Sequence, residues 1–475
     1  MRKLENITPI KDDFGRWFED VVTQGNLIEY GPVKGTMVFK PISYGIWENV
    51  QREMNAIFRK EGAQNVYLPL LIPESYISKE KEHVKGFAPE LATVTRVGKK
   101  VLAEPVVIRP TSEMLFGDLF QKEVNSYNDL PIKYNQWANV VRWEKTTNPF
   151  LRNSEFLWQE GHTCHADSKE ARKMTKRMIK IYAKFFKKYL AIPVVIGRKT
   201  SNEKFAGAVS TYTIEAMMKD GKALQSGTSH YLGQNFAKAM NIKFQTKENK
   251  QEYVYQTSWG ISTRLIGAII MTHGDDRGVI MPPMIASTQI DILEIFGHKN
   301  ENVRKEAARL FKVLSKKYKV RLDSSSKGPG FKSGKSEIEG TPLRIEVGPR
   351  DLENNLVTLV RRDTLEKIQV KLEDVKTEVA KLLKDIQANL LKVATERLDN
   401  NIVELESYED MKKALEQKKF VLVPFAGGAK EEKMIKKETF ATTRCIPFKW
   451  KLKEEKKCII TGVKTKRLVM FAKAY

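Results

Sequence analysis

The chain has 475 residues, of which 41% are hydrophobic and 29% charged, a composition typical of a globular protein with several domains. Lys and Arg total 82 against 58 Asp and Glu, so the formal net charge is +24. This excess indicates a polyanionic partner such as a nucleic acid, although a lysine-rich proteome would give it too.

The sequence also bears on the compartment in which the protein works. Its three cysteines are too few for a disulfide framework and fit a reducing compartment. No apolar run approaches the roughly 20 residues needed to cross a bilayer, and residues 1–17 contain acids but no apolar leader core. We therefore expect a soluble, cytoplasmic protein that does not contact membranes.

The first predicted elements are a helix and an interrupted strand. Residues 43–60 place apolar side chains at helical spacing. The apolar segment VYLPLLIPES follows at 66–75, where Pro69 and Pro73 disfavour a central strand. This segment therefore suits the edge of a sheet or a contact between subunits.

A strand, a turn and a helix are predicted from EPVVIRPTSEMLFGDLF at 104–120. The helix is expected to begin near Thr111, whose hydroxyl would cap it, with Glu113 in the first turn. Capping alone would be a sufficient reason for both polar residues.

The stretch 140–165, VVRWEKTTNPFLRNSEFLWQEGHTCH, places charge and aromatic rings on one surface. If VVRWE is a strand, Arg142 and Glu144 share one face, because side chains alternate along a strand. By the same rule, the run FLWQEGH aligns a second set on one face: Phe156, Trp158, Glu160 and His162.

Two interpretations fit that surface. A guanidinium beside aromatic rings suits a nucleotide, with the phosphate held by arginine and the base stacked on a ring. A structural salt bridge under aromatic packing would give the same pattern, and spacing alone does not separate the two. The neighbouring HTCH offers His162, Cys164 and His165 as metal ligands, but alternation puts the two histidines on opposite faces.

Antiparallel strands with inserted helices are predicted up to residue 287. The polar run QSGTSH lies between strand-like segments and contains Gln225, Thr228 and His230. In the apolar helix ISTRLIGAII, Arg264 lies near the N-terminus, where a positive charge opposes the helix dipole and therefore calls for an anionic partner. These features indicate an α+β domain with a mostly antiparallel sheet over 1–287.

From 288 the pattern changes to strands alternating with helices, which predicts a smaller α/β domain over 288–400 and a small α/β domain over 401–475. The run SSKGPGFKSGKSEIEG ends in GKS, as a nucleotide P-loop does. The P-loop requires a glycine where this chain has Pro329. We therefore interpret the run as a flexible basic loop.

Several of these motifs together resemble a known family. VVRWE with FLRNSEFLWQEGHT resembles motif 2 of the class II aminoacyl-tRNA synthetases, and SWGISTRLIGAIIMTHGD resembles their motif 3. RPTSE, KFAGA, QSGTSHYLGQNF, EGTPLRIEVGPRDLE and FAKAY resemble the prolyl-tRNA synthetases of the eukaryotic and archaeal-like type. The resemblance covers nearly the whole chain in order.

The resemblance implies three domains: a class II catalytic domain on an antiparallel sheet, an anticodon-binding domain and a C-terminal extension. It also implies L-proline, ATP with Mg²⁺ and tRNA(Pro) as partners, and a homodimer with PLLIPES near the contact. In such a site Arg142 and Arg264 would be catalytic. The loop 145–155 would be placed to close over ATP.

The same resemblance assigns binding residues. Those expected to bind ATP are Arg142, Glu144, Arg152, Asn153, Phe156, Gln225, Thr228, Ser262 and Arg264. Those expected to bind proline are Thr111, Glu113, Arg142, Trp158, Glu160, His162, Phe205 and His230. The anticodon candidates are Glu339, Arg344 and Arg350.

Two departures and two rival interpretations qualify the resemblance. The family's C-terminal domain often holds zinc through four cysteines, but only Cys445 and Cys458 stand here, with Thr461 where a further ligand would be, so we expect no structural zinc. The segment near Val209 and Ser210 is less acidic than in the family, for which we have no account. The rivals are a threonyl-type class II synthetase and a non-catalytic tRNA-binding paralogue.

Overall fold

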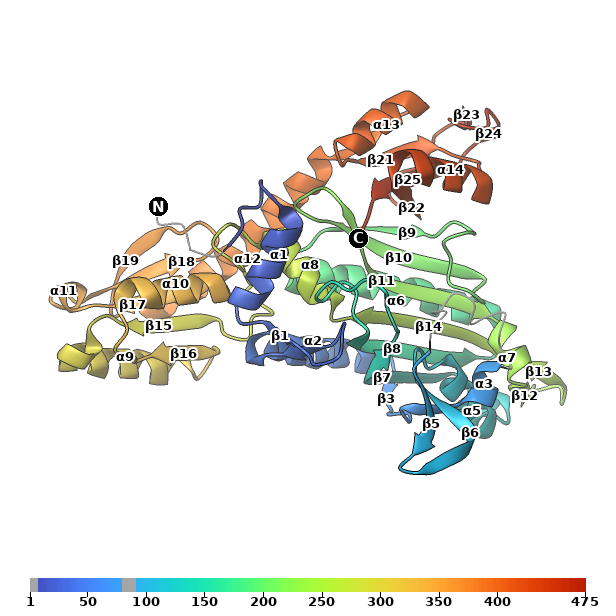
Figure 1. Cartoon of the computed structure of the whole chain (residues 1–475), viewed down its shortest axis with the longest axis horizontal. Helices are drawn as coiled ribbons and strands as arrows, with labels where there is room; N and C mark the ends of the chain where they lie inside the picture. Colours follow the sequence, from blue (N-terminus) through green and yellow to red (C-terminus); the bar gives the residue numbers. More distant parts are fainter. Residues whose placement is uncertain (1–6, 79–90) are drawn as a thin grey trace.

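The computed structural model describes residues 7–78 and 91–475. The first residues of the predicted catalytic domain, 1–6, lie outside this part of the chain. A continuous sheet of eleven strands dominates the fold, on the right of Figure 1, and a five-stranded sheet lies to its left. No helix in the described part of the chain is long and apolar enough to cross a membrane.

The eleven-stranded sheet contains strands from both ends of the chain. Most neighbouring strands are antiparallel, and only the pairs β20–β21 and β3–β7 are parallel. In spatial order the strands are β20 (Ile402–Glu404), β21 (Phe420–Pro424), β25 (Leu468–Lys473), β22 (Ala441–Pro447), β9 (Val194–Arg198), β10 (Ser210–Met217), β11 (Ala223–Gly233), β14 (Tyr255–Ser262), β8 (Glu155–His165), β7 (Ile132–Val141) and β3 (Gln64–Asn65).

The C-terminal segment extends the sheet rather than standing apart from it. Ile446 and Pro447 of β22 pair with Arg198 and Gly197 of β9. Two helices accompany these C-terminal strands: α13 (Tyr408–Glu416) and α14 (Ala429–Thr439). The sequence predicted a small α/β domain over 401–475, but not β22 or its pairing with the first domain's sheet.

One face of the central strands is covered by the largest hydrophobic core. Helix α6 (Ser168–Tyr189) begins at Asp167, whose carboxylate accepts hydrogen bonds from two first-turn amides, and its buried stripe includes Met178 and Phe185. Tyr182 of α6 donates a hydrogen bond to Gln159 of β8. Three more helices contribute to this core: α1 (Phe14–Gln24), α2 (Pro41–Lys60) and α8 (Arg264–His273).

Smaller sheets and short helices accompany the eleven-stranded sheet. A three-stranded sheet holds β4 (Leu71–Pro73), β6 (Lys100–Ile108) and β5 (Thr93–Val97). The two-stranded sheets pair β1 (Ile28–Tyr30) with β2 (Met37–Phe39), and β12 (Lys243–Gln245) with β13 (Gln251–Tyr253). The short helices here are α3 (Glu74–Ser78), α5 (Glu113–Glu123) and α7 (Asn235–Ala239).

The five-stranded sheet forms the second α/β unit, as the sequence predicted. Its strands lie in the order β16 (Val320–Asp323), β15 (Ile290–Glu294), β17 (Leu343–Val347), β18 (Leu356–Arg361) and β19 (Lys367–Lys371). Its helices are α9 (Glu301–Leu314), α10 (Pro329–Glu339), α11 (Pro349–Leu352) and the long α12 (Val375–Asn400). Figure 1 shows α12 running from this unit toward the C-terminal strands.

Two local predictions were wrong. The run expected to be a flexible basic loop is helix α10, which Pro329 opens and whose Lys332 is buried, donating to carbonyl oxygens of Glu294 and Asp323. Strand β7 ends at Val141, before the two charged residues expected on it. The polar run QSGTSH, for which no element was predicted, belongs to β11, because tertiary pairing outweighs its low strand propensity.

A glycine allows the central strands to pack. Gly161 of β8 pairs with Trp259 of β14, and a Cβ on Gly161 would run into the indole ring of Trp259. That ring packs against Phe58 of α2, with 4.9 Å between ring centroids. The missing side chain therefore makes room for the indole that joins sheet and helix.

We predict that Gly161→Ala lowers the free energy of unfolding by about 1–3 kcal/mol, since it overpacks this core. Urea unfolding checks the value. Gly330→Ala in α10 is the matched control: open space surrounds its missing Cβ, so it should raise stability by up to about 1 kcal/mol. Equal stability of the two variants would contradict the packing argument.

Candidate active site

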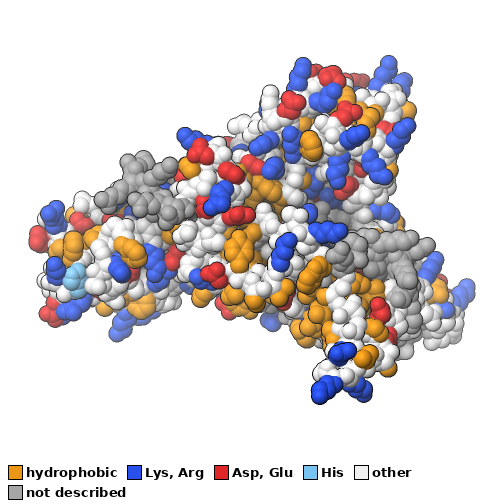
Figure 2. Space-filling model, viewed as in Figure 1, with side chains coloured by type: hydrophobic (Ala, Val, Ile, Leu, Met, Phe, Trp, Pro, Cys, Tyr) orange, Lys and Arg blue, Asp and Glu red, His pale blue; other side chains and the backbone are white. Residues whose placement is uncertain are grey.

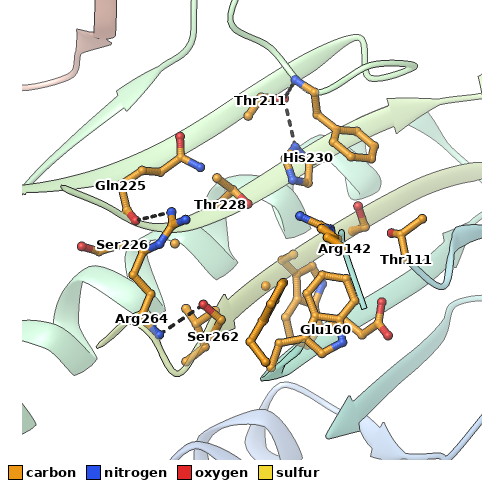
Figure 3. A pocket seen from close by; sticks show the side chains of 18 of the residues that line it. Thr111, Arg142, Glu160, Thr211, Gln225, Ser226, Thr228, His230, Ser262 and Arg264 are labelled. Atoms are coloured by element: carbon orange, nitrogen blue, oxygen red, sulfur yellow. Dashed lines mark hydrogen bonds between the residues drawn. The ribbon is translucent and has the colours of Figure 1, made fainter. Parts of the chain in front are cut away.

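The polar face of the sheet, opposite the main core, contains a pocket of about 330 Å³. It is lined by every residue that the sequence assigned to catalysis, ATP or proline. Figure 3 shows residues of β11, β14 and β8 pointing into this space together. Strand alternation explains the convergence, because Phe156, Trp158, Glu160 and His162 occupy every second position of β8.

Arg142 is fixed at the end of β7 rather than within the strand. Its Nε donates a hydrogen bond to the carbonyl oxygen of Pro110 (2.9 Å), and its backbone N–H donates to Ser154 (2.8 Å). The guanidinium carbon lies 5.4 Å from the ring centroid of Trp158 and 5.6 Å from that of Phe156. The predicted grouping of arginine with these rings therefore forms, but through the loop after β7.

Two effects act on the pKa of Arg142 in opposite directions. Withdrawal from bulk water lowers the pKa of Arg142, while the carboxylates of Glu113, Glu160 and Glu144 raise it. The net direction is downward, so burial outweighs the three acids. An anionic ligand beside the guanidinium would supply further compensation.

Glu160 is the centre of a buried hydrogen-bond network. Its Oε1 accepts hydrogen bonds from Ser112 (2.5 Å) and Gln136 (2.8 Å), and its Oε2 lies 3.0 Å from Nε2 of His162. The His162 ring stacks on Phe116, with 4.0 Å between centroids. These contacts fix the orientation of both Glu160 and His162.

Thr111 does not cap the following helix, so that local explanation was wrong. Ser112 is the N-cap residue, without a side-chain capping bond, and Glu113 is the first residue of α5. The Thr111 hydroxyl donates to the Glu113 carboxylate. Both side chains line the pocket, where a carboxylate at a helix N-terminus is stabilised by the helix dipole.

His230 and Phe205 form the opposite wall. Their rings are 4.5 Å apart, and Nδ1 of His230 lies 2.9 Å from the Thr211 hydroxyl, which also accepts a hydrogen bond from the Phe205 backbone (2.9 Å). Burial, followed by the nearby His162, lowers the pKa of His230 to about 3. The ring is therefore a neutral pocket wall at physiological pH.

Arg264, the first residue of α8, enters the pocket from the side of β11 and β14. Its Nε donates to the Leu151 carbonyl (3.1 Å), its Nη1 to the Gln225 carbonyl (3.3 Å) and its backbone N–H to the Ser262 hydroxyl (3.3 Å). Burial, then repulsion from Arg142 and Arg152, lowers its pKa to about 10. Three arginines that line one pocket make it suited to anions.

The pocket also contains residues that the sequence interpretation missed. They are Phe150, Leu151, Lys199, Glu203, Thr211, Ser226, Gly227, Ser258, Trp259, Gly260 and Ile261. Ser258 could have been predicted, because strand alternation puts it on the same face as Ser262. Lys199 could not, because it lies just after β9, outside the strand's alternating pattern. In the described part of the chain, Ser258 Oγ and Trp158 Nε1 are buried without a hydrogen-bond partner, so a ligand could satisfy them.

The anticodon candidates lie in the five-stranded unit, away from this pocket. Arg344 pairs with Glu337 (2.6 Å) and Glu346 (2.8 Å), and Glu339 pairs with Arg321 (2.5 Å). Arg350 is exposed on α11. Base reading by these residues stays a prediction, and two of the three already have ionic partners.

The metal candidates point apart or are dispersed. His165 contacts Thr163 and Glu170, whereas His162 faces Glu160. Cys445 and Cys458 lie in different hydrophobic clusters. Among residues 7–78 and 91–475, no group of three or more His, Cys, Asp or Glu could hold a metal ion. The expected lack of a zinc site stays a prediction.

Comparison with known proteins agrees with this geometry. Residues 99–273 match the family described as tRNA synthetase class II core domain (G, H, P, S and T), and residues 289–382 match the anticodon binding domain. Residues 408–475 match the family described as prolyl-tRNA synthetase, C-terminal. The fold and pocket are thus those of a class II aminoacyl-tRNA synthetase, which confirms the predicted fold class.

Full-length relatives show to which family within this class the chain belongs. The proline–tRNA ligases of Mycoplasma mobile and Mycoplasmopsis synoviae are 60% and 61% identical to this chain, over the whole of both chains in each case. The crystal structure of prolyl-tRNA synthetase from Cryptosporidium parvum, complexed with halofuginone and AMPPNP, aligns with a TM-score of 0.95 at 38% identity over 99% of each chain. This chain belongs to the prolyl-tRNA synthetase family. Because these two curated relatives are bacterial, the eukaryotic and archaeal-like type is not confirmed.

The helix that presents Arg264 to the pocket has a titratable group at its other end. His273, the last residue of α8, is 5% exposed, and its Nε2 lies 2.9 Å from the Leu190 carbonyl oxygen. Burial lowers the pKa of His273 to about 3, although the Leu190 contact acts in the opposite direction. The folded protein therefore keeps this ring neutral where an unfolded chain would protonate it.

We predict that this histidine makes the protein less stable in acid. Between about pH 6.5 and pH 3 the unfolded chain binds the proton and the folded chain does not, so stability falls as pH falls. His273→Gln should reduce the slope of unfolding free energy against pH by up to about 1.4 kcal/mol per pH unit in that window. Denaturant unfolding at pH 8, 6 and 4.5 measures the slope; a slope equal to that of the wild type would refute the neutral assignment.

Proposed function

We propose that the pocket activates L-proline with ATP, forming prolyl-adenylate and pyrophosphate, and then transfers the prolyl group to the 3′ end of tRNA(Pro). One observation carries this function: all the residues that family resemblance assigns to ATP and proline line one pocket. Arg142, Glu144 and Arg264, which a non-catalytic paralogue would be expected to lose, are all present.

The first step requires two anions to meet. A carboxylate oxygen of proline attacks the α-phosphorus of ATP, and the bond to the pyrophosphate oxygen breaks. No protein nucleophile is needed, so the site acts by aligning the reactants and stabilising the charge that develops. Arg142 would hold the α-phosphate and the proline carboxylate, and Arg264 would hold ATP phosphate, since guanidinium groups stay charged and bridge oxygens.

The remaining assignments divide the pocket into two halves. In the ATP half, Phe156 would stack on adenine and Glu144 would accept from its amino group, with Arg152, Asn153, Gln225, Thr228 and Ser262 completing the contacts. In the proline half, Trp158 and Phe205 offer apolar surface to the ring. Glu113 and Thr111 would bind the charged secondary amine, beside the fixed Glu160, His162 and His230.

Magnesium fits this pocket as a companion of ATP. Carboxylates and hydroxyls line it, and Mg²⁺ prefers oxygen ligands, usually one or two carboxylates together with phosphates. Glu203, which also lines the pocket, would be available to hold it. When bound, the ion would neutralise phosphate charge.

The rest of the chain would serve tRNA and dimerisation. The unit that matches an anticodon binding domain would read tRNA(Pro), with domains divided at 1–287, 288–400 and 401–475. The match of 408–475 to the prolyl C-terminal family and the short connection from β8 to β10 support the eukaryotic and archaeal-like type.

A homodimer is supported by apolar side chains exposed around the proline-rich segment. Tyr67 is 70% exposed and Leu71 48%, and Figure 2 shows hydrophobic side chains gathered over the region of α2. Three free, buried cysteines fit the reducing environment of the cytoplasm.

Pyrophosphate exchange with each of the twenty amino acids in turn tests the activity, followed by charging of tRNA(Pro). Proline should support exchange; dependence on threonine would instead favour the threonyl rival. Arg142→Ala should lose about 3 kcal/mol or more of transition-state stabilisation, because the developing charge loses its donor. The exposed Arg304 of α9, far along the chain from the pocket, offers Arg304→Ala as a control. Near-normal exchange by Arg142→Ala would overturn the assignment.

We further predict that the pure protein activates alanine and does not correct the error. Alanine lacks part of the proline ring, and a missing methylene discriminates by only about 1–3 kcal/mol. The segment between β8 and β11 contains only α6, β9, β10 and their loops, too little for an editing insertion. Alanine-dependent pyrophosphate exchange checks the first half; rapid alanine-stimulated ATP hydrolysis would contradict the second.

A further inference from the structure

A fully buried carboxylate lies beside the pocket with a cation on each side. Glu215 of β10 is 0% exposed. Its Oε1 is 3.0 Å from Nζ of Lys199 and accepts from the Thr213 hydroxyl (2.8 Å). Its Oε2 accepts two hydrogen bonds from Arg444, from Nε at 3.0 Å and Nη2 at 2.9 Å.

The three charges depend on one another energetically. Lys199 is 6% exposed and Arg444 7%, so each is almost as withdrawn from water as Glu215. Removing one member of a buried ion network leaves the others uncompensated. Burial raises the pKa of Glu215, but Arg444 and Lys199 outweigh that effect and hold it below its ordinary value. The triad therefore carries a net charge of +1 in the wall of the pocket.

The triad belongs to the ATP half of the pocket. Lys199 lines the pocket, and Glu215 pairs across the sheet with Gln225, whose carbonyl oxygen accepts from Arg264. The charges of Glu215 and Arg444 both act on Arg264, the first raising its pKa and the second lowering it. A change in the triad would thus change the electrostatic environment of Arg264, where ATP phosphate is expected.

Arg444 comes from the C-terminal segment. It lies on β22, the strand that attaches this segment to β9, and its Nη1 also donates to the Thr442 hydroxyl (2.9 Å). It does not itself line the pocket described above. Its influence on a ligand would pass through Glu215 to Lys199, whose ammonium has three donors and gives one to Glu215.

We propose that Arg444 is a positioning residue for ATP: it fixes Glu215, which holds Lys199 in the pocket wall with its ammonium toward an anionic oxygen of ATP. The C-terminal segment is then part of the nucleotide site and not only an appendage of the sheet. This inference rests on the proposed function for the identity of the anion.

The test compares Arg444→Met, Lys199→Met and the double variant in the full-length protein. ATP dissociation constants come from isothermal titration, and KM values for ATP and proline from proline-dependent pyrophosphate exchange. Each single variant should weaken ATP roughly tenfold, within the range of coupled charge networks, while the KM for proline changes less than about twofold. The double variant should be little worse than Lys199→Met, because Arg444 acts through Lys199.

Two variants test whether Arg444 positions Glu215 and Lys199 or only attaches the C-terminal segment to the sheet. Arg444→Lys keeps the charge and should recover part of the ATP affinity. Arg467→Met is the matched control, since Arg467 holds only carbonyl oxygens and the Phe425 ring within the C-terminal segment. It should lower the unfolding temperature without changing ATP affinity. If Arg444→Met fails to fold, the ATP affinity of Lys199→Met tests the inference, because the ion pair between Glu215 and Arg444 remains in that variant.

Unchanged ATP affinity in Lys199→Met, or equal weakening of ATP and proline in Arg444→Met, would overturn the inference. Fully additive effects in the double variant would overturn it as well. Failure of the proposed function looks different: the wild type would then show no proline-dependent exchange. Direct titration with ATP would still report whether the triad governs nucleotide affinity.

Discussion

Arg142 and Arg264 are held facing one small space at the ends of two different elements, and their withdrawal from bulk water is the constraint on which the rest of the site depends. Each is withdrawn from bulk water, which lowers both pKa values, and Arg142 adds to the lowering at Arg264. The fold compensates with backbone carbonyls of Pro110, Leu151 and Gln225 and with nearby carboxylates. Two buried guanidinium groups facing one space are suited to the anions that adenylate formation requires.

Holding those arginines demands a rigid floor, which the antiparallel sheet provides. One face of β8 packs on the core through Gln159 and the indole over Gly161, so the other face presents Glu160 and His162 in fixed positions. The network around Glu160 then fixes side chains in the half of the pocket proposed for proline. Catalysis by alignment needs this, because the binding geometry must exist before the substrates arrive.

The sheet also joins parts of the chain that are far apart in sequence. Strand β22 of the C-terminal segment pairs with β9. Arg444 of β22 forms an ion pair with Glu215, a carboxylate beside the pocket. Helix α8 runs from Arg264 to the buried end at His273, where Arg397 of α12 donates to the Thr272 carbonyl oxygen (3.0 Å). The half of the pocket proposed for ATP is therefore packed against both the C-terminal segment and the helix that follows the anticodon-binding unit.

The sequence by itself determined most of the elements and many of the residues that line the pocket. Strand alternation placed Phe156, Trp158, Glu160 and His162 on one face, and the family motifs pointed to further pocket residues, because both depend on local spacing. It could not decide that QSGTSH is a strand or that the GKS run is a helix, since neighbouring elements override weak local propensity there.

Only the tertiary structure decided which charges meet. Alternation alone left both a structural salt bridge and a nucleotide site open for Arg142, with the salt bridge slightly favoured, and only the folded chain shows which groups surround it. It also brought together Lys199, which follows β9, Glu215 of β10 and Arg444 of β22, the last more than two hundred residues along the chain from the others. Local periodicity fixes the face on which a side chain lies, but its partner across the sheet depends on strand order, which is a property of the whole fold.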